Sequence, residues 1–115
     1  MGVKDQLRIV IDNEATDLVV VALDGELDMA SGPRLQSALE GEEVLASPSV
    51  VLDLHQLEFL DSTGLRIILA AREHCRERNQ AFAVTRGSQQ VQRLLSVTGV
   101  DEHLRTVATP GEMHI

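Results

Sequence analysis

The segment Leu18–Leu23 is an unbroken apolar run, and it constrains the fold more than any other feature of this sequence. The run is short for a helix, and its β-branched valines favour a strand. A strand without a polar face is buried on both sides, as in a sheet covered by helices. Upstream, Leu7, Ile9 and Ile11 share one face of a second strand, and a short polar segment links the two. We therefore predict an antiparallel hairpin at the start of the fold.

Beyond the hairpin, segments with the period of a helix alternate with further apolar runs. Ser31 is a candidate N-cap and Pro33 fits the first turn of one helix, while Ser88 and Gly99 fit the start and end of another. The expected elements are a helix over 31–46 with Leu35, Ala38, Leu39 and Leu45 on its apolar stripe, a strand over 50–54, a helix over 63–79, a strand over 81–85, a helix over 88–98 and a strand over 104–109. This order predicts an α/β fold, a mixed sheet of about four to five strands packed against three to four helices.

Length and charge narrow the class of protein. The 115 residues predict one domain, with a core over about 7–109 and a mobile tail at 110–115. Ten Lys and Arg against 18 Asp and Glu give a net charge of −8, which would repel a nucleic-acid backbone. No apolar run approaches the ~20 residues of a membrane span, and Met1–Val10 lacks the apolar region of a signal peptide. We expect a cytoplasmic protein without a direct nucleic-acid or membrane partner.

The residues of common catalytic sites are absent or scattered. The sequence contains no GxxxxGK[ST], GxGxxG or GxSxG motif. Its histidines are His55, His74, His103 and His114, none of which forms a pair at metal-ligand spacing, so we expect them on the surface. Cys75 is the only cysteine, which excludes an internal disulfide, and its place on a helix flank predicts a core residue. We expect neither a metal nor a cofactor.

Two enzyme-like or signalling classes fit parts of the sequence and fail on others. A phosphoacceptor receiver domain has about this length, but it needs a helix between its first two strands, and residues 13–17 leave no room for one. It also needs a late lysine, whereas Lys4 is the only lysine. Asp61-Ser62-Thr63-Gly64 is similar to the Asp-Ser/Thr-Gly of aspartic proteases, but it has an extra residue and leads into a helix. Nothing supplies the paired carboxylates of that mechanism.

Phe59-Leu60-Asp61-Ser62-Thr63-Gly64-Leu65 joins a predicted strand to a predicted helix. The free N–H groups and dipole of a helix N-terminus favour an anion there. Local physics by itself favours a structural interpretation, in which Asp61 or Ser62 caps the helix and Gly64 allows close packing.

Four segments in order resemble one family. Gly25-Glu26-Leu27-Asp28, the strand Val50–Leu54 and the segment Phe59–Leu65 are similar to the anti-sigma factor antagonists of the STAS family. Val91–Leu95 with Thr98-Gly99-Val100 resembles the third helix of that family and its end. The resemblance extends from about Leu7 to Val107, and its most specific part is the Asp-Ser-[Ser/Thr]-Gly-Leu step.

This resemblance implies a STAS-like fold and a regulatory role. Family members bind an anti-sigma factor that is an ATP-dependent serine kinase, and binding frees a sigma factor. The kinase phosphorylates the serine after the Asp, here Ser62, and a phosphoserine phosphatase resets the cycle. The implied partner-binding surface comprises Asp61, Ser62, Thr63, Gly64, Asp28 and Ser31. Thr63 stands where many relatives carry a second serine, which makes it a candidate second phosphosite. For Ser31 the helix-cap interpretation is preferred.

The resemblance therefore predicts a non-enzymatic binding module switched by phosphorylation of Ser62. Two alternatives remain: a constitutive STAS scaffold in a larger signalling or transport-linked assembly, and a small nucleotide-binding or hydrolysing protein. The second lacks a glycine-rich phosphate loop. The acidic surface and single partner site predict a monomer, with a weak dimer left open.

Overall fold

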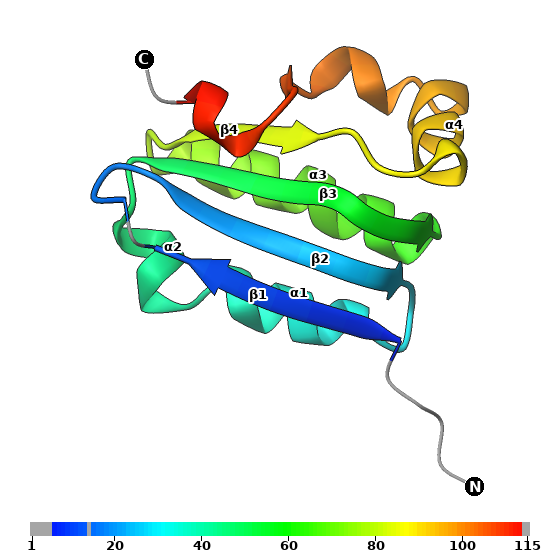
Figure 1. Cartoon of the computed structure of the whole chain (residues 1–115), viewed down its shortest axis with the longest axis horizontal. Helices are drawn as coiled ribbons and strands as arrows, with labels where there is room; N and C mark the ends of the chain where they lie inside the picture. Colours follow the sequence, from blue (N-terminus) through cyan, green and yellow to red (C-terminus); the bar gives the residue numbers. More distant parts are fainter. Residues whose placement is uncertain (1–5, 14, 114–115) are drawn as a thin grey trace, which may run out of the picture.

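A mixed five-stranded sheet forms the centre of the structure, a computed structural model that describes residues 6–13 and 15–113. The strands lie in chain order across the sheet (Figure 1). β1 is antiparallel to β2, and the other neighbours are parallel. This confirms the predicted hairpin and the mixed sheet. The strands are β1 (Leu7–Asp12), β2 (Val19–Leu27), β3 (Ser49–Leu60), β4 (Ala81–Thr85) and β5 (Thr106–Val107).

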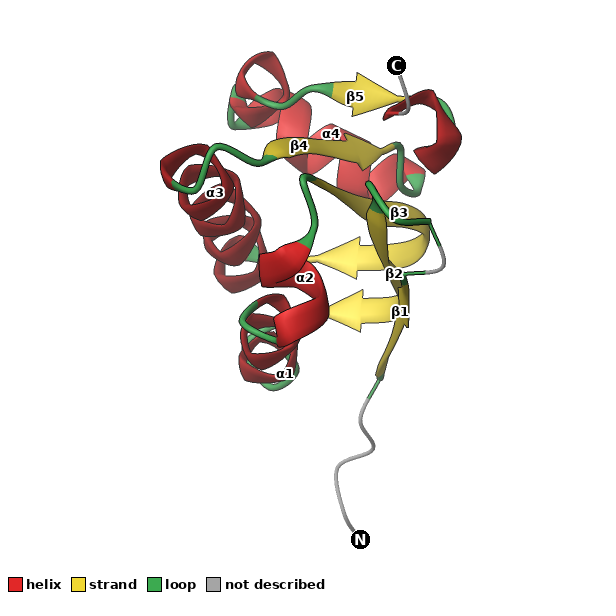
Figure 2. Ribbon diagram, turned by 90° about the vertical axis from the view of Figure 1, so that its left-hand side faces the viewer, coloured by secondary structure: helices red, strands yellow, loops and turns green. Residues whose placement is uncertain are grey.

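Three helices cover one face of this sheet, as Figure 2 shows edge-on, and a fourth packs against β3. The helices are α1 (Gly32–Leu39), α2 (Glu42–Ala46), α3 (Ser62–Glu77) and α4 (Gln89–Val97), with the 3-10 turns η1 (Val100–His103) and η2 (Pro110–Met113). Ser88 caps α4 by accepting from Val91 N, and Gly99 follows its end with φ +78°, both as predicted. The main aliphatic core lies between the sheet and these helices.

The predicted helix over 31–46 is two helices. It breaks after Leu39, and Gly41 precedes α2 with an extended backbone. The break changes the helical phase, so Val44 is buried and Leu45, which we expected on the apolar stripe, is 41% exposed. The predicted stripe is therefore wrong at Leu45.

Other boundaries also differ from the prediction, among them the end of β2, which continues to Leu27 beyond the apolar run at 18–23. β3 continues to Leu60 instead of ending at 54, because the register of its pairing with β2 shifts twice and keeps Leu57 and Leu60 facing inward. β5 is only two residues long. The expected mobile tail is wrong for residues 110–113, which form η2. Met113 is buried there in a second cluster with Leu18, Val51, Ala83 and Val107 on the other face of the sheet. Residues 114 and 115 lie outside the described part.

Thr85 compensates for the end of pairing between β3 and β4. Its buried hydroxyl accepts from Leu54 N at 2.8 Å and donates to Asp53 Oδ1 at 2.7 Å. Thr85→Val keeps the shape but leaves the Leu54 N–H without an acceptor, so we expect a loss of about 1–3 kcal/mol of unfolding free energy. Urea denaturation measures it. The control Thr98→Val removes an exposed hydroxyl that donates to Leu94 O, and equal losses in both variants would contradict the argument.

Candidate functional site

The candidate site lies at the edge of the sheet where the parallel strands β2 and β3 end. Their last residues, Leu27 and Leu60, are Cα partners. The next amide, Asp61 N, donates to Leu27 O at 3.2 Å. The loops after the two strands therefore begin side by side, and Asp28 and Asp61 share one edge, as expected for parallel strands.

Asp61 is the N-cap of α3 and also holds the neighbouring loop. Its backbone is extended, and Oδ1 accepts from Gly64 N at 3.0 Å, which satisfies one of the unpaired amides of the first turn. Oδ2 accepts from Met29 N at 3.2 Å. One carboxylate therefore joins the helix to a loop that is distant in sequence.

Asp28 and Ser31 organise that loop from within. Asp28 Oδ1 accepts from the amides of Ala30 and Ser31, both at 3.0 Å. The Ser31 hydroxyl is buried, accepts from Asp28 N and donates to Glu26 O, both at 3.0 Å. Ser31 occupies the N-cap position of α1 but makes no capping bond with its side chain, so the helix-cap interpretation is wrong for this hydroxyl. Ser31 instead closes the loop back onto the end of β2.

The two neighbouring hydroxyl residues have different surroundings. Ser62 is the first residue of α3 and is exposed, whereas Thr63 is half-buried. Thr63 Cγ2 lies 3.4 Å from the position that a Cβ on Gly32 would take, so Thr63 faces α1. Within the described chain, Ser62 makes no side-chain hydrogen bond, because the capping role belongs to Asp61. Ser62 is therefore the more accessible hydroxyl.

Gly64 allows the start of α3 to approach the sheet closely. A Cβ at this position would lie 2.6 Å from Leu60 Cδ1 and 2.9 Å from the carbonyl oxygen of Leu27. Gly64 is buried, as is Ser31, so these two members of the predicted surface shape it from below. Whether a partner binds this surface stays a prediction.

Sequence reasoning missed two residues next to the candidate site, Gln90 and Met29. The Gln90 side chain reaches from α4 to the backbone of Leu60. Gln90 Oε1 accepts from Leu60 N at 3.0 Å, and Gln90 Nε2 donates to Leu60 O at 3.2 Å. This pair fixes the backbone next to Asp61. Met29 is apolar but 74% exposed, on the loop after β2. The sequence shows that Met29 follows Asp28, but it does not show that the Met29 side chain is exposed, because exposure depends on the fold.

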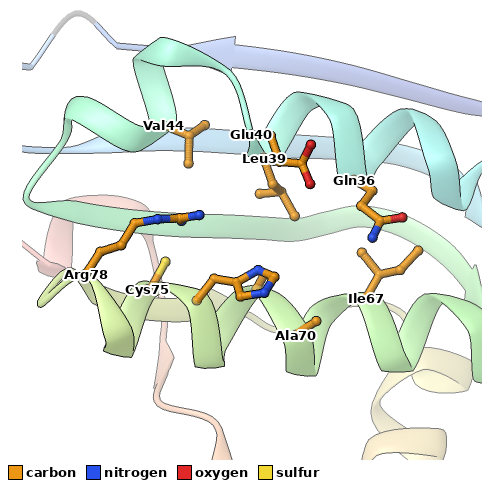
Figure 3. Close-up of a pocket in the computed structure, with 10 residues that line it drawn as sticks. Gln36, Leu39, Glu40, Val44, Ile67, Ala70, Cys75 and Arg78 are labelled. Carbon is orange, nitrogen blue, oxygen red and sulfur yellow. The ribbon is translucent and has the colours of Figure 1, made fainter.

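A small cavity lies between α1, α2 and α3, along the part of α3 from Ile67 to Cys75 (Figure 3). Its volume of about 30 Å³ leaves room for a water molecule. Leu39, Val44 and Ile67 line it together with the thiol of Cys75. Burial raises the pKa of the Cys75 thiol, an effect that the charge of Arg78 opposes. Cys75 is 3% exposed and belongs to the core, as predicted.

The other candidate ligands stay apart. Over residues 6–13 and 15–113 no three His, Cys, Asp or Glu side chains gather at a distance suited to a metal ion. His55, His74 and His103 are exposed, as predicted, and His114 lies outside the described residues. Within the same part of the chain, no helix is long and apolar enough to cross a membrane.

Removing the Asp61 carboxylate tests its capping role. We expect Asp61→Ala to lower the unfolding free energy by about 0.5–2 kcal/mol, because Gly64 N loses its acceptor at the helix N-terminus. Asp61→Asn keeps an acceptor oxygen and is expected to recover most of that loss. Urea denaturation of the natural protein and the two variants measures these free energies of unfolding. Equal stability of the Ala and Asn variants would contradict the capping role.

Comparison with known proteins gives one family. The family model described as "Mlab, STAS domain" matches residues 11–107. The anti-sigma-B factor antagonist of Listeria monocytogenes is 28% identical over 108 residues, which cover 94% of this chain and 95% of that protein. The anti-sigma-F factor antagonist RsfB of Mycobacterium tuberculosis is 30% identical over 110 residues, 95% of this chain and 88% of that protein.

A solved structure agrees with these relatives. The crystal structure of an anti-sigma factor antagonist from Mycobacterium paratuberculosis superposes with a TM-score of 0.81 at 28% identity, covering 97% of this chain and 94% of that one. The similarity therefore spans the whole sheet and its helices, including the edge that carries Asp61 and Ser62.

Proposed function

The chain belongs to the STAS domain family, and on that premise we propose that it is an anti-sigma factor antagonist, a regulatory binding protein and not an enzyme. It binds an anti-sigma factor of the ATP-dependent serine kinase type and thereby releases a sigma factor. The kinase switches it off by phosphorylating Ser62, and a phosphoserine phosphatase restores it. The cycle runs in the cytoplasm, and neither nucleic acid nor membrane contacts this chain directly.

The observation that carries the proposal is the accessibility of Ser62 beside an anchored Asp61. The carboxylate of Asp61 is held by two amides, while the neighbouring hydroxyl is exposed. In the transfer, Ser62 Oγ bonds to the γ-phosphorus of ATP, and the bond from that phosphorus to the ADP oxygen breaks. The hydroxyl proton passes to a base of the kinase, and the products are phosphoserine and ADP.

The start of α3 tolerates the added charge. A phosphate on Ser62 carries about −1.5 to −2 at pH 7 and stands at the positive end of the helix dipole. In the described chain the amides of Ser62 and Thr63 have no acceptor, and Arg66 lies one helical turn further on the same side. Phosphorylation is therefore compatible with the folded protein.

The same charge is unfavourable for a docked partner. Met29 supplies apolar surface next to Ser62, and a groove of about 460 Å³ between α1 and α3 begins at Met29 and Thr63. A partner that covers this surface removes water from Ser62. It then meets a desolvated dianion next to the Asp61 carboxylate. The switch acts at the interface and leaves the fold in place.

A two-bait capture experiment tests the proposal. Ser62→Ala and Ser62→Asp are presented to lysate of the native organism with ADP, which occupies a kinase without donating a phosphoryl group. We expect the Ala bait to capture a small ATP-binding kinase that mass spectrometry identifies as an anti-sigma factor. The Asp bait should be depleted of it. Equal capture by both baits would overturn the switch and leave a constitutive STAS scaffold.

Phosphate transfer from ATP with the captured kinase then identifies the acceptor. We expect incorporation into the natural chain and into Thr63→Val, and none into Ser62→Ala. Incorporation that survives in Ser62→Ala and disappears in Thr63→Val would move the phosphosite to the neighbouring hydroxyl.

A further inference from the structure

The two edges of the sheet differ in how they are protected. β5, at one edge, is two residues long and leads into η2, which packs against it. β1 forms the other edge (Figure 1). It has six residues, an unbroken register with β2 and no proline. No described strand pairs with its outer side. Natural proteins normally shorten, bend or charge such an edge because it is a template for further strand pairing.

The pattern of hydrogen bonds shows which groups β1 presents outward. Gln6 O accepts from Glu26 N, so the even-numbered residues of β1 bond to β2. Ile9 and Ile11 therefore direct their N–H and C=O groups away from the sheet. Leu7 O, the next outward group, accepts from Arg34 Nη1 at 2.6 Å. The open part of the edge is centred on residues 9–11.

The side chains around this edge are also apolar and incompletely covered. Ile9 and Ile11 are half-buried on the helix side, where they line a shallow, open depression with Pro33, Arg34, Ser37 and Ala38 of α1. On the other face, Val10 is 51% exposed. An added strand would cover apolar surface on both faces of the sheet.

We propose that β1 pairs antiparallel with β1 of a second copy of this chain, centred on Val10, to form a continuous sheet through a homodimer. In this register Ile9 lies opposite the partner's Ile11 and exchanges two backbone hydrogen bonds with it, and the symmetry repeats the pair. Arg8 lies opposite the partner's Asp12 on the outer face, twice per dimer. Val10 meets the partner's Val10 on the two-fold axis.

Charge complementarity selects both the occupant and the register. A register centred on Ile9 places Arg8 opposite an apolar Val10, and one centred on Ile11 places Asp12 opposite Val10. Only the register centred on Val10 pairs unlike charges and like apolar side chains together, which is the arrangement that stabilises cross-strand pairs. Arg8 already lies 3.4 Å from Asp24, but both side chains are exposed, so the guanidinium is able to bond to a second carboxylate.

The dimer is independent of the anti-sigma role. In the antiparallel dimer, β2 and β3 of one copy run in the opposite direction to β2 and β3 of the other. The two Ser62 sites, each at the C-terminal ends of these strands, therefore face opposite ends of the joined sheet. Both sites stay open to partners, so failure of one proposal does not affect the other.

Sedimentation equilibrium of the full chain tests the dimer from micromolar to millimolar concentration. We expect a reversible change from 12.6 kDa to twice that mass. Val10→Glu places two carboxylates opposite each other and is expected to raise the dissociation constant at least about tenfold. The matched control is Val97→Glu, since Val97 is 77% exposed on α4, away from β1, and its change should have no effect.

Two further variants test the register. Arg8→Asp and Asp12→Arg are each expected to weaken the dimer, and the double variant to restore it by exchanging the charges. Val10→Cys is expected to form a disulfide-linked dimer on oxidation, because opposed residues of this kind have Cα atoms about 4.5 Å apart, within the range for a disulfide. Cys75 is buried and does not compete, and Val97→Cys is the control.

A monomer at every concentration would overturn the proposal. A dimer that Val10→Glu and Val97→Glu weaken equally, or that neither weakens, would place the interface elsewhere and also overturn it. A single-charge variant that dimerises as well as the double variant would exclude the register centred on Val10.

Discussion

Replacing Gly25 by alanine is expected to lower the free energy of unfolding by at least about 3 kcal/mol, because strain and a broken strand pairing add. Gly25 has φ +115°, in a region that side-chain-bearing residues rarely adopt. A Cβ there would lie 1.8 Å from the backbone oxygen of Gln6. That oxygen accepts from Glu26 N, so the clash separates β1 from β2 just before the loop that Asp28 organises.

Gly99→Ala is the matched control for Gly25→Ala. Gly99 also has a positive φ, +78°, but nothing lies within 4 Å of the position of its Cβ. Gly99→Ala is therefore expected to lose only the free energy of holding alanine at a positive φ, about 1 kcal/mol. Urea denaturation of both variants separates strain from collision. Equal losses would mean that the backbone of β1 moves aside freely, contrary to the argument.

Phosphorylation of Ser62 is expected to reduce affinity for the anti-sigma partner at least about 100-fold, which corresponds to about 3 kcal/mol. The desolvated phosphate and the Asp61 carboxylate supply that cost at the interface. The free energy of unfolding is expected to change by less than about 1 kcal/mol, because the helix N-terminus offsets the charge. Binding falls while the fold persists.

Chains with phosphoserine incorporated at one position measure this directly. Titration calorimetry compares phosphoserine at position 62 with phosphoserine at position 46, an exposed position at the end of α2, near the start of β3 and at the opposite end of that strand from Leu60. The control adds the same net charge far from the proposed interface and should bind within about threefold of the unmodified chain. Equal weakening by both would mean that overall repulsion, and not the site, opposes binding.

The sequence was sufficient to predict the helices and strands that are determined by local patterns of residues. β4 has the predicted bounds, β1 contains the predicted alternation of Leu7, Ile9 and Ile11, and α3 and α4 begin within a residue or two of the prediction. Alternation and N-caps are short-range features, which is why they were visible. The break between α1 and α2 was missed, since a single glycine is tolerated within a helical pattern and Leu45 continued the stripe. The extension of β3 depends on shifts in register with β2 that no local pattern encodes.

Segment 59–65 joins a strand to a helix, as predicted, but the hydrogen bonds within the candidate site were not predictable. Asp61 and Ser62 were equal candidates for the cap, and the extended backbone of Asp61 decided between them. The hydroxyl of Ser31 bonds to Glu26 O, and Gln90 holds Leu60 from another helix. Each of these contacts requires two segments to meet in space, so the residue type alone does not indicate its partner.

The shared anchoring of Met29 N and Gly64 N on Asp61 also determines how this edge moves in time. Rotation about the Cα–Cβ bond of Asp61 withdraws both carboxylate oxygens in a single event. Both amide hydrogens therefore become exchangeable with solvent together, although they belong to different segments. We therefore expect the two amides to be protected to a similar degree in hydrogen exchange, since one side chain holds both.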